Sequence, residues 1–144
     1  MKALDYFTVL DKTRIGEAIK EAEDATSGEI RVYIEDRCKT DVLDRAAFIF
    51  AEMNIHKTAL RNGVLFYLAI HDKKFAVIGD AGIHTNVGQD FWDSVKDMMA
   101  AEFHNERFTD GLVAGIKEAG IVLQKYFPFQ KGDSNELSDE IVIA

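Results

Sequence analysis

Cysteine and proline are almost absent from this chain: Cys38 and Pro128 are single instances among 144 residues. One cysteine can form neither an internal disulfide nor a zinc cluster, and it fits a reducing compartment. The longest apolar run, Val64 to Ile70, is far shorter than the roughly 20 residues that a membrane-spanning helix needs. The N-terminus also lacks the apolar core of a signal peptide. We therefore expect a cytoplasmic protein without a membrane partner.

Positive charge is scarce as well. The 17 lysines and arginines are outnumbered by 25 acidic residues, which gives a net charge of −8. The basic residues are scattered and form no sequence patch, so we expect no nucleic-acid partner. The chain has no G-x-S-x-G elbow, Walker loop or G-x-G-x-x-G fingerprint, and its four histidines show no i, i+4 pairing. The common serine-hydrolase, nucleotide-binding and zinc motifs are therefore missing.

The apolar pattern is that of one globular α/β domain, because a chain of this length can bury roughly 68% of its unfolded surface. Periodicity predicts helices over residues 8–25, 41–53, 90–104 and 109–127, and strands over residues 29–35, 64–70 and 75–78. The helix between the first two strands implies a parallel crossover. The four-residue turn after residue 70 makes the third strand antiparallel. These features predict an α/β fold with a small mixed sheet.

Several finer expectations concern which residues are buried. The first strand alternates polar and apolar residues, which predicts one buried face. The core face of the helix over 41–53 is predicted to consist of Leu43, Ala46, Ala47, Phe50 and Met53. Glycines 111, 115 and 120 should allow the last helix to pack closely.

Residues 1–128 are predicted to form the domain and residues 129–144 an acidic, frayed tail, with Ile141–Ile143 as a possible short edge strand.

The hairpin should bring chemistry-bearing residues to one end of the sheet, here named edge A. Edge A gathers the starts of the first two strands and the end of the third: Ser27, Gly28, Glu29, Arg61, Asn62, Gly63, Gly79, Asp80 and Gly82. Residues 83–89 and the start of the next helix should close over it. The oxygen ligands predicted for calcium or another divalent cation are Asp80, Asp90, Glu29, Asn62 and Asp93. Alternatively, Asp80 is a turn residue and Asp90 a helix cap.

Three other hypotheses remain open. A metal-assisted phosphomonoesterase would use Asp80 and Asp90 for the metal and Arg61 for the phosphate. A competing site, here named edge B, lies at the carboxyl ends of the parallel strands, where open α/β sheets usually bind ligands. Edge B gathers Glu35, Asp36, Asp41, Asp44, His71 and Asp72, although capping and solvation would also explain these residues. The third hypothesis is a protein-interaction module that uses a helix face and no ligand.

Ordered motifs give the chain a resemblance to a known family. SGEIRVYI, a helix, RNGVLFYLA, DKKFAVIGDAGI and a late F-x-x-G-L-x-x-G follow one another, and together they resemble the TPM domain over residues 5–128. The resemblance implies a three-layer α/β/α sandwich, in a stand-alone bacterial form. It also implies either acid phosphatase activity or divalent-cation binding, calcium above all.

Matched residue by residue, the resemblance implies that the family's functional positions correspond here to Asn62, Gly63, Gly79, Asp80 and Gly82. The family often has an acidic residue just before the Asn-Gly pair, where this chain has Arg61. A cation at that place should weaken metal binding locally, unless the Arg61 side chain points away or the domain uses other acids. We therefore expect a calcium-binding domain with a regulatory or interaction role, and a phosphatase as the alternative.

Overall fold

The computed structural model describes residues 1–130 and 141–144, and within these residues it contains six α-helices and a four-stranded sheet. The helices are α1 (Ala3–Tyr6), α2 (Val9–Asp24), α3 (Val42–Glu52), α4 (Ala81–His84), α5 (Gln89–His104) and α6 (Phe108–Tyr126), with a 3-10 turn, η1 (Ile55–Lys57). The strands are β1 (Glu29–Glu35), β2 (Gly63–Ala69), β3 (Lys74–Gly79) and β4 (Ile141–Ile143). No helix in this part of the chain combines the length and apolar character that crossing a bilayer requires.

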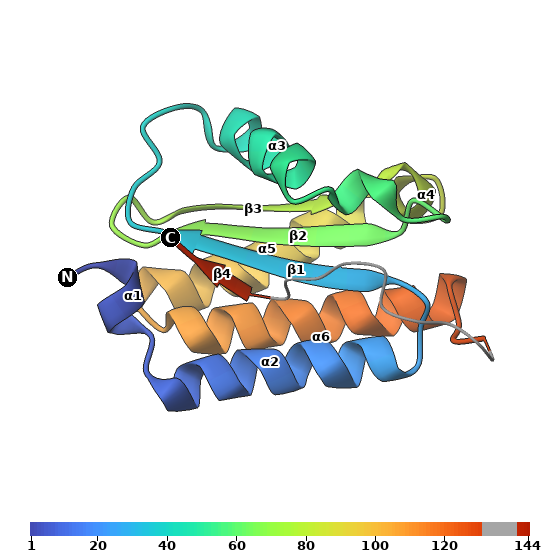
Figure 1. The fold of residues 1–144 in the computed structure, drawn as a ribbon, viewed down its shortest axis with the longest axis horizontal. Helices are drawn as coiled ribbons and strands as arrows, with labels where there is room; N and C mark the ends of the chain where they lie inside the picture. Colours follow the sequence, from blue (N-terminus) through green and yellow to red (C-terminus); the bar gives the residue numbers. More distant parts are fainter. Residues whose placement is uncertain (131–140) are drawn as a thin grey trace.

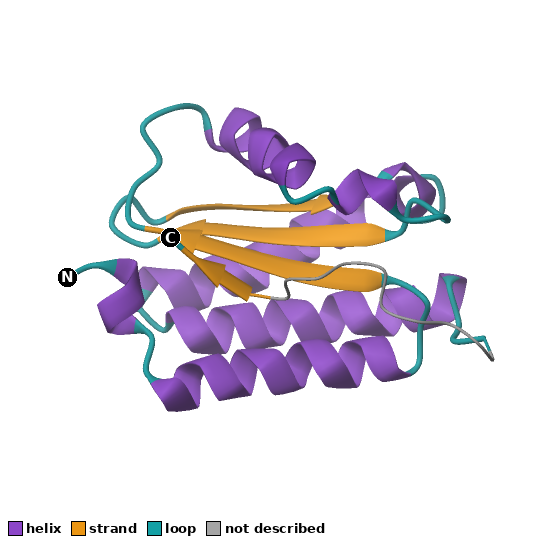
Figure 2. Ribbon diagram, in the orientation of Figure 1, coloured by secondary structure: helices purple, strands orange, loops and turns teal. Residues whose placement is uncertain are grey.

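The sheet lies between two layers of helices, as Figures 1 and 2 show. Its strand order is β3-β2-β1-β4. β1 is parallel to both β2 and β4, whereas β2 and β3 form the antiparallel hairpin. α2, α5 and α6 cover one face, and α3 covers the other over β2 and β3. The predicted α/β sandwich with a mixed sheet is confirmed.

Two hydrophobic cores lie on opposite faces of this sheet. The larger packs Ile30, Val32 and Phe66 against α2, α5 and α6. The smaller packs Leu65 and Tyr67 against α3 and η1. The expectation of one buried face on β1 is wrong, since Glu29 and Arg31 on the other face are only 2% and 1% exposed. Polar residues on a strand therefore did not mark a solvent-facing side.

The buried face of α3 also differs from the expected one. Ala46 and Ile49 are its buried residues, whereas Leu43 is 56% exposed and Ala47 faces solvent. Ala46, Phe50 and Met53 of the predicted face do pack into the smaller core. Val42 and Ile49 join them in place of Leu43 and Ala47, so the helix is rotated only slightly from the expected orientation. Its ends were predicted correctly: Asp41 caps the first turn, and Asn54 follows the helix in the left-handed conformation, with φ 57°.

Three details at chain and helix ends complete the fold. Asp90 lies in the first turn of α5, whose N-cap is Gly88, so the predicted start was one residue late. Ile141–Ile143 does form a strand, with Val32 beside Ile141 and Ile34 beside Ile143. β4 therefore belongs to the same sheet as β1, β2 and β3. The expectation of a frayed tail also covers residues 131–140, which lie outside the described residues.

Two helical glycines give a matched test of the close packing between α2 and α6. A Cβ at Gly120 would lie 2.7 Å from Ala22 Cβ, whereas one at Gly16 would meet only Ile141 Cδ1, at 3.9 Å. Both changes to alanine gain helix propensity of about 0.5–1 kcal/mol. We expect Gly16→Ala to raise the free energy of unfolding by that amount and Gly120→Ala to lower it by about 1 kcal/mol, because overpacking outweighs propensity. Urea denaturation measures the free energy of unfolding of each variant. If both substitutions changed it in the same direction, the close packing of α2 against α6 at Gly120 would be contradicted.

Candidate functional site

At edge A, the carboxylate of Asp80 accepts three hydrogen bonds. It follows β3 directly, and its backbone N donates to Gly63 O at 3.0 Å, so the hairpin brings the two strand ends together as predicted. Its carboxylate, on a residue only 6% exposed, accepts from Arg61 Nε and Nη2, both at 2.7 Å. It also accepts from Ala81 N at 2.7 Å and so caps α4. Hydrogen bonding and charge from Asp80 raise the pKa of Arg61.

Arg61 reaches α4 with its main chain as well. Its φ of 52° lies in the left-handed region, and its carbonyl accepts from Gly82 N at 2.9 Å. A Cβ at Gly82 would lie 2.7 Å from Arg61 O and closer still to Leu60 O. Arg61 therefore fixes the start of α4 against the entrance to β2 through both its backbone and its guanidinium.

Asn62 and Asp80 are neighbours that face opposite sides of the sheet. The Cβ positions of Gly63 and Gly79 point to Ile55 and Trp92, which belong to different cores. Because side chains alternate along a strand, Asp80 lies on the Ile55 side and Asn62 on the other. Asn62 Nδ2 donates to Ser27 Oγ at 3.3 Å, and its buried Oδ1 has no hydrogen-bond partner among the described residues.

The other expected ligands do not join Asp80 either. Glu29 shares its face but is separated from it by Gly63, above which Ile55 fills the space. Asp90 is exposed on α5, and Asp93 accepts from Gln89 Nε2 at 3.0 Å. Among residues 1–130 and 141–144, no three His, Cys, Asp or Glu side chains gather as metal ligands would. These residues, as arranged, do not fit a resident divalent cation.

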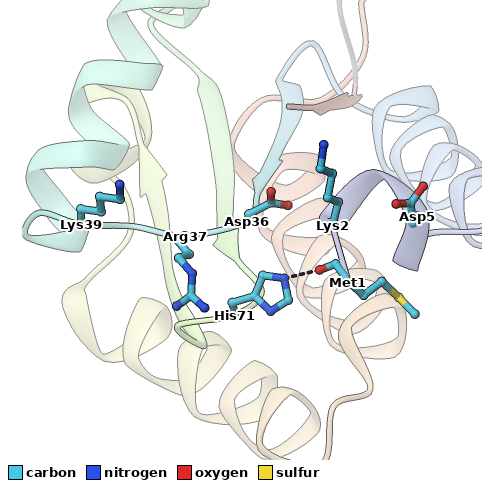
Figure 3. Close-up of a pocket in the computed structure, with 7 residues that line it drawn as sticks. All are labelled: Met1, Lys2, Asp5, Asp36, Arg37, Lys39 and His71. Atoms are coloured by element: carbon cyan, nitrogen blue, oxygen red, sulfur yellow. Dashed lines mark hydrogen bonds between the residues drawn. The ribbon is translucent and has the colours of Figure 1, made fainter.

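Edge B carries an open pocket of about 750 Å³ beyond the carboxyl ends of β1 and β2 (Figure 3). Its lining residues come from the N-terminal segment, the loop after β1 and the turn after β2: Met1, Lys2, Asp5, Asp36, Arg37, Lys39 and His71. Of the six residues that defined edge B, only Asp36 and His71 line it. Sequence reasoning missed Lys2 and Asp5 because it did not predict α1, whose four residues are too few for periodicity.

Two acids hold the wall of this pocket in place. Asp36 Oδ1 accepts from Ala3 N at 2.6 Å, which docks α1, and Asp36 O accepts from His71 N at 2.9 Å. His71 Nε2 also contacts Met1 O (Figure 3). Asp72 accepts from Cys38 N at 2.7 Å and from Arg37 Nη1 at 3.2 Å. The carboxylates of Asp36 and Asp72 are thus engaged in structure rather than open to a ligand.

Lys2 and Lys39 differ from these acids, because neither forms an ion pair or hydrogen bond with its side chain in the described part of the chain. Both residues are exposed lining residues of the pocket, and Figure 3 shows their side chains extended. Arg37 adds a third cation, whose side chain is 60% exposed. The pocket therefore offers basic groups that a ligand can reach.

Other edge B acids are structural. Glu35 accepts from Arg45 Nε and Nη2, both at 2.9 Å, and from the Tyr67 hydroxyl. Burial alone would raise the pKa of Glu35, but hydrogen bonds from Arg45 and Tyr67 bring it below its ordinary value. Burial and the bond to Glu35 raise the pKa of Tyr67. Asp41 caps α3 through Leu43 N and Asp44 N, as capping alone would predict.

Comparison with known proteins agrees with the fold and the motifs. A sequence model of the TPM domain matches residues 3–122. The NMR structure of the BA42 protein from the psychrophilic bacterium Bizionia argentinensis is similar, with 42% identity, a TM-score of 0.89 and coverage of 96% of both chains. A comparison with curated protein sequences found no match.

Two further solved structures share the fold at low identity. The N-terminal domain of the cg2496 protein from Corynebacterium glutamicum is 12% identical, with a TM-score of 0.64 over 94% of this chain and 79% of that one. The N-terminal domain of a P. gingivalis protein is 13% identical, with a TM-score of 0.68 over 83% of this chain and 78% of that one. The sequence match over most of the chain and the shared sandwich settle the family: this chain belongs to the TPM domain family.

Proposed function

We propose that this TPM domain works by binding rather than by catalysis, and that a small, negatively charged ligand enters the pocket at edge B. The observation that carries the proposal is the place of the pocket, at the carboxyl ends of two parallel strands, with Lys2, Arg37 and Lys39 on its lining. Open α/β sheets usually bind ligands at such strand ends. Ligand binding there would serve a regulatory or interaction role.

The charges of the pocket favour an anion over a cation. Its acids are Asp5 and Asp36, and Asp36 already accepts from Ala3 N. In a chain with a net charge of −8, a lining with three cations against two carboxylates is a local exception, although Arg37 already pairs with Asp72. Exposed lysines and arginines attract anions by long-range Coulomb forces, which weaken as salt is added. The openness of the pocket favours a small ligand held by charge rather than by burial.

Edge A supports the non-catalytic part of the proposal. The phosphomonoesterase hypothesis needs Asp80 to hold a metal and Arg61 to hold the phosphate, yet these two side chains are bonded to each other. Calcium binding by Asp80, Asp90, Glu29, Asn62 and Asp93 stays a prediction that the arrangement of these residues does not favour. The cytoplasmic location and the lack of a nucleic-acid partner also stay predictions.

Amide NMR titrations with inorganic phosphate and p-nitrophenyl phosphate test the binding proposal. We expect saturable shifts at residues 36–39 and 71, with a dissociation constant on the order of 1 mM. The variant Lys2→Gln/Lys39→Gln should bind about fivefold more weakly, because each exposed charge contributes a fraction of a kcal/mol. Lys117→Gln, on α6 and outside the pocket, is the matched control and should bind as the wild type does.

Each contrary result has a distinct meaning. Unmoved resonances at residues 36–39 and 71, or equal affinity in the double variant, would overturn the site. Release of p-nitrophenol above the background rate would replace binding with catalysis. If that release disappeared in Asp80→Asn, the reaction would belong to edge A and the phosphatase hypothesis would stand.

A further inference from the structure

We infer that Arg61 takes the place at edge A that the family resemblance assigns to a divalent cation. Its guanidinium neutralises Asp80 from within the chain, so this end of the sheet is ordered without a metal. The inference concerns edge A alone and is independent of the ligand proposed for edge B.

The first support is the geometry of the pair. A guanidinium offers two parallel N–H donors that match the two oxygens of a carboxylate. Arg61 makes both bonds, Nε to Oδ2 and Nη2 to Oδ1, at 2.7 Å each. Asp80 Oδ1 also accepts from Ala81 N at 2.7 Å. Few lone pairs of this carboxylate are left to bind a cation.

The second support is burial. Asp80 is 6% exposed, and a buried carboxylate is costly unless an opposite charge or several hydrogen bonds compensate it. The groups around Asp80 that could compensate it are the backbone N–H of Ala81 and the guanidinium of Arg61. The Arg61 side chain itself is 52% exposed, so it brings its charge to Asp80 from the solvent side. A metal ion would approach the same carboxylate from the same side.

The third support is that Arg61 belongs to the structure it stabilises. Its left-handed backbone and the Gly82 N–H donated to its carbonyl already place residue 61 beside α4. A bound ion connects separate loops by coordinating both, and here one residue connects the entrance of β2 to the start of α4 by covalent attachment and hydrogen bonds. A glutamate at position 61 could not compensate Asp80 and would need a cation between the two carboxylates.

The test compares thermal unfolding of the full chain in EDTA and in 5 mM calcium, a concentration above the dissociation constants of roughly 0.1–1 mM that weak calcium sites have. We expect the Tm of the wild type to be the same in both and the amides of residues 80–84 to be unmoved by calcium. Arg61→Glu should melt roughly 2–4 °C lower in EDTA, because two carboxylates then face each other. Calcium should restore most of that loss and shift residues 80–84.

Three controls make each outcome decisive. Arg61→Lys keeps the positive charge and should stay insensitive to calcium. Arg14→Glu, which breaks an exposed pair with Asp110, should show no calcium-dependent recovery. Arg61→Glu/Asp80→Asn should lose the calcium response. Saturable calcium shifts at residues 80–84 in the wild type would overturn the inference, and so would an Arg61→Glu variant that calcium does not stabilise.

Discussion

Glu35→Ala is expected to lower the free energy of unfolding by on the order of 3 kcal/mol, because it leaves a buried hydroxyl and a partly buried guanidinium without an acceptor. Arg45 loses both of its bonds to the carboxylate, and the Tyr67 hydroxyl loses its acceptor in the smaller core. The estimate is at the low end for a buried pair, since the Arg45 side chain is 31% exposed and that of Glu35 is 13% exposed. Urea denaturation at neutral pH measures the loss.

Lowering the pH should weaken the same interaction, because it protonates Glu35. Hydrogen bonds from Arg45 and Tyr67 outweigh burial and hold the pKa of Glu35 below its ordinary value of 4.5. A depressed pKa contributes stability that is fully present above the unfolded pKa and is lost as the pH falls through the folded pKa. The stability of the wild type should therefore fall more steeply below about pH 4.5 than that of Glu35→Ala.

Two variants separate the charge from side-chain volume and from exposed pairs. Glu35→Gln keeps an acceptor for Tyr67 and should lose less stability than Glu35→Ala, while it removes the same acid dependence. Glu102→Ala breaks the Arg107 pair, in which both side chains are partly exposed, and should change the stability little. Equal losses in Glu35→Ala and Glu102→Ala would contradict a buried network at Glu35.

Gly82→Ala should be about as damaging, with an expected loss of about 3 kcal/mol. The added methyl group would lie 2.7 Å from Arg61 O and still closer to Leu60 O. Both obstacles are backbone carbonyls, which cannot rotate away as a side chain can. Relief would require α4 to move from the entrance of β2, which would break the bond from Gly82 N to Arg61 O.

Gly88→Ala is the matched control, because a Cβ there would meet no atom within 4 Å. It caps α5 from a φ of −73°, which alanine also adopts, so only a small loss is expected. Urea denaturation gives the size of each effect, and hydrogen exchange of the amides of residues 82–84 locates it. If the two variants lost equal stability, α4 would not be packed against Leu60 and Arg61 as described.

The sequence predicted the sheet well because its signals were local and strong. The strand over residues 29–35 was placed with correct bounds, and the turn after residue 70 defined the hairpin. Helices α1 and α4 were missed, since four residues form barely one turn and show no periodicity. The core face of α3 was predicted only in part, because apolar residues occur on more than one of its sides.

The candidate sites were harder to predict, because residues that lie close together along the backbone need not point their side chains toward a common site. The hairpin correctly placed Asn62 near Asp80, but alternation sends their side chains to opposite faces. That outcome could have been derived from the strand register. The bond between Arg61 and Asp80 could not, because it depends on the left-handed backbone of Arg61, which no sequence signal indicated. Lys2 and Asp5 reached edge B through α1, which the sequence did not predict.

Both ends of the described chain come to edge B (Figure 1). Ala3 N bonds Asp36 just beyond β1, and Ala144 N donates to Ile34 O at 2.9 Å. A ligand bound among Lys2, Arg37 and Lys39 would thus connect the N-terminal helix to the loop that follows β1. Occupancy of the pocket would therefore tighten the docking of α1 on the end of the sheet.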